Sequence, residues 1–138
     1  MKANIRQVKG LTFVGKSSSN HWLVIDGPIE FAGSEAAARP MELLLISLGS
    51  CTASDVSSIL KKKKVELNEF EVNLNAERQE NHPKVFTKIN IDYLFSGTDI
   101  KDKDVKRAID LSLSKYCPIS SMLSKTVNIS YKFKINNI

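Results

Sequence analysis

The sequence predicts a small α+β protein, and three observations support that class. Short apolar segments separated by turn residues occupy the beginning of the chain. A long helical segment opened by Pro40 follows them, and two long stretches of alternating apolar and polar residues come next. Because 138 residues can bury a core without crosslinks, we expect one domain over residues 1–138.

Residues 1–39 are expected to form a three-stranded segment. Its strands are predicted at Asn4–Val8, Thr12–Lys16 and His21–Asp26. Gly10 and the polar cluster 17–20 supply the turns between them. The stretch Ile29–Arg39 shows no clear periodicity of apolar residues, so no helix or strand is predicted there.

A helix is predicted over residues 40–62. Proline suits the first helical position, because its missing N–H would have no partner inside the helix there. Glu42 lies in the first turn and suits the positive end of the helix dipole, whereas Lys61–Lys64 suit the negative end.

Residues 65–138 are expected to form a hairpin followed by helices and a final strand. The alternating segments Glu66–Arg78 and Val85–Phe95 predict the hairpin, with its turn at 81–83. Three further elements are predicted: an amphipathic helix at Asp99–Tyr116, a short helix at Ile119–Ser124 and a strand at Val127–Ile135. We therefore expect antiparallel sheets packed around the long central helix.

Composition excludes several classes of function. The net charge of +5 is mild, and no glycine-rich phosphate loop is present, so we expect no nucleic-acid partner. The N-terminus lacks the apolar core of a signal peptide, and the longest apolar run, Leu43–Ile46, is too short for a membrane span. A cytoplasmic location is expected. His21 and His82 lack ligands at zinc spacing, so neither a metal nor another cofactor is expected.

Cys51 lies in the middle of the predicted helix, on a narrow polar stripe. At about 100° per residue, the stripe shares one face with Cys51 and consists of Ser47, Ser54, Asp55 and Ser58. The opposite face is apolar or small, with Ile46, Gly49, Ala53, Val56 and Leu60. A stripe of this kind favours the floor of a groove, although free cysteine is also common as a small core residue.

Cys117 falls where one predicted helix ends and Pro118 begins another. Unpaired N–H groups at a helix start stabilise a thiolate, so we expect a lowered pKa for Cys117. In a reducing compartment, two such cysteines favour a redox pair over a structural disulfide, while a buried cysteine at a helix junction is the alternative.

Four segments together resemble the OsmC/Ohr family, in its YhfA-like branch. They are Arg39–Leu45, Leu48–Cys51, Asp55–Val56 and Tyr116–Pro118. The resemblance implies an intertwined homodimer and the thiol-dependent reduction of organic or inorganic hydroperoxides, with a dithiol as reductant. It also implies that Cys51 is the peroxidatic cysteine and Cys117 the resolving one, and that Glu42 matches the active-site glutamate of the family.

Helix geometry constrains how Glu42 could serve Cys51. Nine positions along a straight helix span about 13.5 Å and place the two side chains roughly half a turn apart. A shared site therefore requires a bent helix or Glu42 from a second subunit. Ohr-like members use an arginine in the N-terminal strands to stabilise the thiolate. The stretch Phe13–Asn20 contains Lys16 but no arginine, so Arg39 and Arg78 are the candidates for this role, with Lys16 as the alternative.

Two functions follow as hypotheses. The first is a peroxidase that cycles through a Cys51–Cys117 disulfide. The second is a non-catalytic protein that binds a small hydrophobic or electrophilic ligand in the cleft around Cys51.

Overall fold

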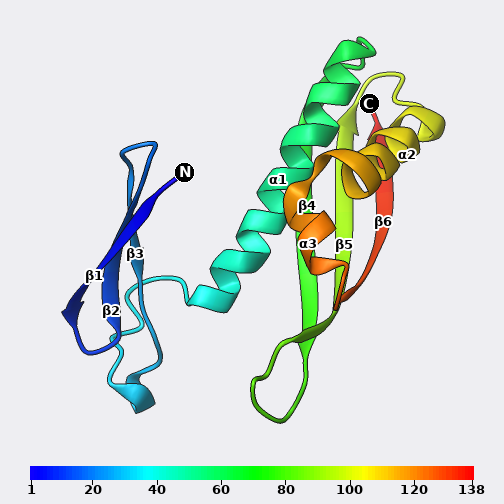
Figure 1. The fold of residues 1–138 in the computed structure, drawn as a ribbon. Helices are drawn as coiled ribbons and strands as arrows, with labels where there is room; N and C mark the ends of the chain where they lie inside the picture. The colour runs from blue at the N-terminus through cyan, green and yellow to red at the C-terminus, as the bar shows by residue number, and fades with distance from the viewer. The chain divides into compact units, whose positions relative to one another are not determined.

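The computed structural model describes all residues, Met1–Ile138, and they form two compact units, Met1–Leu45 and Ile46–Ile138. The long predicted helix is present with its expected bounds as α1, Pro40–Lys62 (Figure 1). Its first turns belong to the first unit and the remainder to the second.

The first unit contains the three predicted strands as one antiparallel sheet. Its elements are β1 (Ala3–Lys9), β2 (Thr12–Ser17), β3 (Trp22–Ile25) and a short 3-10 helix η1 (Ile29–Phe31). Buried Asp26 organises the following loop, since its carboxylate accepts hydrogen bonds from the N–H groups of Gly27, Ser34 and Ala36. Burial opposes ionisation of Asp26, but these hydrogen bonds together lower its pKa.

The second unit is built on a mixed sheet with β5 in the centre. The predicted hairpin is present as β4 (Leu67–Arg78) and β5 (Phe86–Gly97), which are antiparallel. The last strand, β6 (Asn128–Asn137), pairs with β5 in parallel, so the expectation of purely antiparallel sheets was wrong for this strand (Figure 1). The intervening helices form a crossover, which returns the chain to the end of the sheet where β5 begins.

A bulge changes which side chains of β5 face the core. The pairing skips Thr87, because Glu77 lies opposite Lys88 whereas Arg78 lies opposite Phe86. Phe86 is therefore buried with Ile89, and Val85 is exposed, although simple alternation predicted that Val85 and Ile89 share a face.

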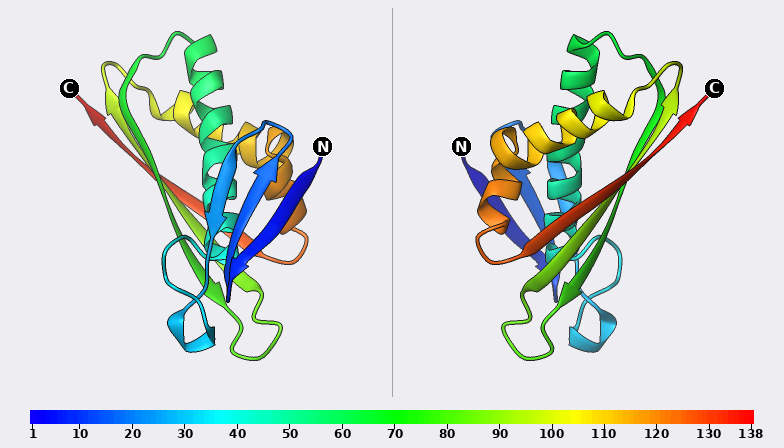
Figure 2. Two further views of the ribbon diagram at one scale, coloured as in Figure 1. Left: turned by 90° about the vertical axis from the view of Figure 1, so that its left-hand side faces the viewer. Right: turned by 90° about the vertical axis from the view of Figure 1, so that its right-hand side faces the viewer.

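Three helices cover one face of this sheet (Figure 2). Besides the later turns of α1, they are α2 (Asp102–Leu111), which continues into a wider π-helical turn η2 (Ser112–Tyr116), and α3 (Pro118–Leu123). The wider turn shifts the buried stripe, so that Ser112 is buried, whereas Tyr116, the last residue of the predicted amphipathic helix, is exposed.

In the second unit, α1 contacts the sheet through side chains spaced four residues apart. Leu48, Thr52, Val56 and Leu60 are completely buried. Ile46, which the sequence places on the apolar face opposite Cys51, is 58% exposed in the single chain. The helix is long and apolar enough to meet the criteria for a membrane span, with a mean hydropathy of 1.5. A helix with a stripe of fully buried side chains packed against a sheet is instead typical of a protein core.

Candidate functional site

Cys51 and Cys117 are brought together, although they lie far apart in the sequence. Cys51 comes from the middle of α1, and Cys117 from the junction between η2 and α3. Their sulfur atoms and a carboxylate oxygen of Asp55 all lie within 4.8 Å of one another, and both thiols are free. The predicted pair is thus a spatial pair, with Asp55 as its third member.

Cys117 caps the start of α3, as its position before Pro118 predicted. Its backbone is extended, Pro118 follows at the first helical position, and its Sγ accepts a hydrogen bond of 3.3 Å from the N–H of Ser120. The side chain is only 2% exposed. A buried cysteine at this junction is therefore also a hydrogen-bonded helix cap.

The pKa of Cys117 is raised to about 11, so the predicted lowering was wrong. Burial is the largest cause, and the neighbouring sulfur of Cys51 adds to it through a hydrogen bond and charge repulsion. The N–H groups of Ser120 and Ile119 do lower the pKa, as expected, but they are outweighed. Cys117 is therefore protonated at neutral pH and can donate its S–H to the sulfur of Cys51.

Cys51 lies at the border between solvent and core. It is half-buried, next to fully buried Thr52, while Ser54 and Ser58 of the predicted polar stripe are exposed. The two thiols thus differ in access: a solvent-borne reagent reaches Cys51 before it reaches Cys117.

Asp55 belongs to a hydrogen-bonded chain that leads into the core. The Ser112 hydroxyl oxygen lies 2.9 Å from both Asp55 Oδ2 and Thr52 Oγ1, and its single hydrogen can be donated to either one of them. Thr52 in turn shares a 2.7 Å hydrogen bond with the hydroxyl of buried Tyr93, and burial raises the pKa of Tyr93 to about 12. Within Ile46–Ile138, no ion pair involves Asp55.

Sequence reasoning missed the three hydroxyl groups of this chain. The only signal in the sequence was the spacing of Thr52 four residues from Leu48 and Val56, which places it on their face. Ser112 and Tyr93 carried no such signal, because only the tertiary structure brings them to Thr52.

The other predicted site residues have local contacts. Glu42 Oε2 accepts a 2.9 Å hydrogen bond from the N–H of Arg39 at the start of α1, and the Arg39 guanidinium pairs with Glu35 at 3.1 Å. Arg78 Nε donates to the carbonyl oxygen of Lys84, at 2.7 Å, in the hairpin loop. The roles expected of Glu42, Arg39 and Arg78 at the thiol remain predictions.

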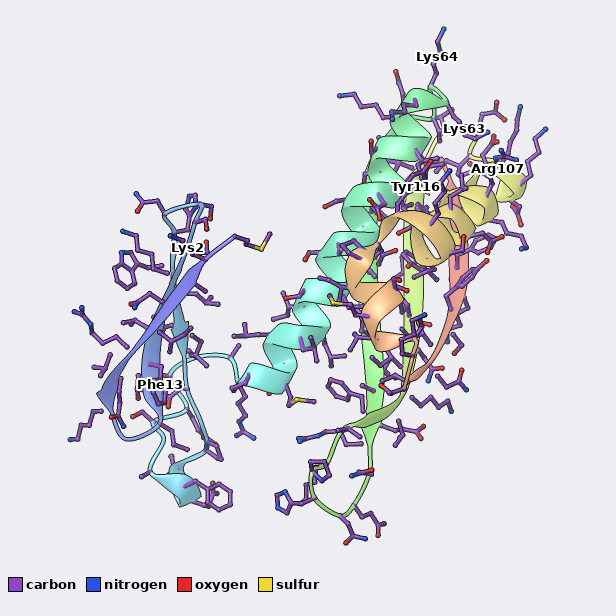
Figure 3. The ribbon with its side chains drawn as sticks, viewed as in Figure 1. Lys2, Phe13, Lys63, Lys64, Arg107 and Tyr116 are labelled. Atoms are coloured by element: carbon purple, nitrogen blue, oxygen red, sulfur yellow. The ribbon has the colours of Figure 1, made fainter.

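A second, basic feature lies at the end of α1. Lys63 forms a 2.8 Å ion pair with Asp104 of α2, and this hydrogen bond is the main cause that lowers the pKa of Asp104. Lys63, directly after the end of α1, and Arg107 of α2 are labelled in Figure 3, and both line an open groove of about 910 Å³. The ion pair joins the two helices, so Lys63 is not simply a solvated end of the lysine cluster.

Fold and site together define an α+β protein with a dithiol–carboxylate cluster on a core helix. Residues 33–132 match the family model described as OsmC-like protein. The chain is 42% identical to Protein YhfA of Escherichia coli (strain K12), over 98% of each chain. The chain belongs to the OsmC-like family, which confirms the resemblance and the α+β class predicted from the sequence.

Solved structures agree with this assignment. A hypothetical protein from Aquifex aeolicus VF5 is 33% identical, with a TM-score of 0.83 over 99% of this chain and 97% of its own. An organic hydroperoxide resistance protein OsmC from Legionella pneumophila has a TM-score of 0.73 over 96% and 95% of the two chains. At 15% identity, the second similarity shows a shared fold.

Proposed function

We propose that the protein is a thiol peroxidase that reduces hydroperoxides through the Cys51–Cys117 pair. The observation that carries the proposal is the arrangement of the sulfurs: a half-buried thiol lies within 4.8 Å of a buried, protonated one. The name of the Legionella pneumophila protein, which has the same fold, agrees with this chemistry.

The first step oxidises Cys51. Its thiolate attacks one oxygen of the hydroperoxide, the O–O bond breaks, and the second oxygen leaves as an alcohol after taking up a proton. The sulfur loses two electrons and becomes a sulfenic acid, while the peroxide gains them. The half-exposed position of Cys51 suits this encounter.

The second step forms the disulfide. The sulfur of Cys117 attacks that of Cys51, the S–O bond breaks, and the departing hydroxide combines with the proton of Cys117 to give water. An external dithiol then supplies two electrons and two protons and restores both thiols. Because Cys117 is buried and Cys51 is half-buried, the peroxide meets Cys51 first.

The charged residues complete the proposal. Asp55 disfavours a neighbouring thiolate if it is ionised, so a cation must offset it, and we assign this role to Arg39 or Arg78. Glu42 is assigned to the site through a second subunit. Under this assignment, Arg39→Ala or Arg78→Ala lowers the rate at pH 7, whereas Asp55→Asn raises it.

Stopped-flow oxidation tests the peroxidase directly. Reduced protein is mixed with cumene hydroperoxide or with hydrogen peroxide, with and without a dithiol, and turnover is followed. Peroxide should produce an intrachain disulfide, seen as a loss of two hydrogens by non-reducing mass analysis. Stoichiometric peroxide that leaves both thiols intact would contradict the proposal and favour the non-catalytic binding protein.

We also propose that the chain acts in the cytoplasm as a homodimer. In the single chain, several large apolar side chains are exposed, including Trp22, Leu23 and Val24 of β3 and Ile46 of α1. Such surfaces are typical of interfaces. Co-refolding Cys51→Ser chains with Glu42→Ala chains should restore some sites, whereas a monomer in light scattering at micromolar concentration would contradict the dimer.

A further inference from the structure

Asp55 is the member of the thiol cluster that peroxide chemistry leaves unexplained. Its carboxylate lies with both sulfurs inside 4.8 Å, has no ion pair within Ile46–Ile138, and is hydrogen-bonded by one hydroxyl, that of Ser112. When a thiol beside this carboxylate ionises, the two negative charges cost electrostatic free energy unless a cation is present.

The three groups have the arrangement of a metal-ligand set. Cys51 and Asp55 are four residues apart on α1, which places both side chains on one face of the helix, and Cys117 enters from a second element. Two ligands four residues apart on a helix, completed by a third from elsewhere, are a recurrent zinc-binding pattern.

The distances between the three groups and the chemical types of their ligand atoms also agree with zinc binding. Zinc binds thiolate sulfur at about 2.3 Å and carboxylate oxygen at about 2.0–2.2 Å, so tetrahedral ligand atoms lie roughly 3.5–3.8 Å apart. The observed span of at most 4.8 Å needs only a side-chain adjustment of about 1 Å. Two sulfurs select thiophilic ions over magnesium or calcium.

We propose that the reduced protein binds one Zn²⁺ ion through Cys51 Sγ, Cys117 Sγ and an oxygen of Asp55. The metal replaces the thiol protons, which pass to solvent, and a water molecule fills the fourth position. No metal was expected from His21 and His82, and this ligand set uses neither histidine. The site needs reduced thiols but not peroxide turnover, so it stands apart from the proposed peroxidase.

Bound zinc would also control the thiols. Both sulfurs would use an electron pair to hold the metal, so neither could attack a peroxide, and oxidation to the disulfide would destroy the site. Metal binding and disulfide formation are then mutually exclusive states of the same pair.

Cobalt is the probe, because thiolate-bound Co²⁺ absorbs in the near ultraviolet and zinc displaces it. Titration of the reduced, full-length protein should give this absorption with one ion per chain, and oxidation of the thiols should abolish it. Asp55→Asn, which keeps an acceptor for Ser112, should weaken cobalt binding at least about tenfold. Asp99→Asn makes the same change at an exposed aspartate and should leave binding unchanged.

Two results would overturn the proposal: no thiolate–cobalt absorption at stoichiometric metal, or parental affinity in Asp55→Asn. A second measurement uses only the parent protein, in case the variant does not fold: zinc should slow alkylation of Cys51 severalfold, and an unchanged rate would refute the site. Protein that binds cobalt but does not reduce peroxide supports the metal site and rejects the peroxidase, and the reverse result does the opposite.

Discussion

The raised pKa of Cys117 predicts that this thiol makes the folded protein sensitive to alkali. Its pKa is about 11 in the folded protein, against an ordinary value of 9.0. Below about pH 9, the thiol is protonated in both the folded and the unfolded state. As the pH rises further, the unfolded chain ionises first, so stability is lost until the pH passes the folded pKa.

The size of the loss follows from the two pKa values. Each pKa unit corresponds to about 1.4 kcal/mol, so the complete effect is about 3 kcal/mol. At about pH 10.5, roughly 2 kcal/mol of it should be lost, a large fraction of the stability of a small protein.

Urea unfolding of the reduced protein at about pH 8 and about pH 10.5 measures this loss. Lysines and tyrosines also titrate in alkali, so the pH-dependent loss in Cys117→Ala is subtracted from that of the parent. In Cys51→Ser, burial still raises the pKa of Cys117, but the neighbouring sulfur is gone. The loss of stability in alkali that is due to Cys117 should therefore be smaller in this variant than in the parent. If the parent and Cys117→Ala lose stability in parallel, Cys117 has no raised pKa and the reasoning fails.

Three further variants test packing by urea unfolding. Thr52→Val should lower the free energy of unfolding by about 1–3 kcal/mol, because it leaves the buried Tyr93 hydroxyl without its hydrogen-bond partner. An unchanged free energy of unfolding would mean that this hydroxyl finds another partner. Leu48→Ala should cost about 2–5 kcal/mol if the fully buried side chain is core, and under about 1 kcal/mol if it is not. Gly10→Ala should cost more than about 1 kcal/mol, since Gly10 has a φ of +54° and an added Cβ would lie 2.0 Å from the Ala32 carbonyl oxygen; unchanged stability would contradict this turn.

Several features of the fold were predictable because they depend on local chemistry. Pro40 and the terminal lysines marked both ends of α1, and the alternation of β4 marked a half-buried strand. Pro118 marked the start of α3 and therefore the capping position of Cys117. Each of these signals acts between residues within a few positions of one another, so the sequence alone carries them.

Other features depend on pairings between distant segments, which local patterns do not encode. The parallel pairing of β6 was decided by the crossover through the helices, and the bulge at Thr87 by the register between β4 and β5. The π-helical turn η2 placed Ser112 in the core and Tyr116 in solvent.

The candidate site likewise combines features that local sequence determines with features that only tertiary packing creates. The sequence by itself determined that Cys51 and Asp55 share a helix face and that Cys117 caps a helix, because both follow from helix geometry. Only the tertiary structure decided that the two sulfurs lie together with Asp55, and that the hydroxyl chain reaches Tyr93. It also reversed the expected pKa shift of Cys117: the helix N–H groups are local, but burial and the Cys51 sulfur, which outweigh them, come from packing.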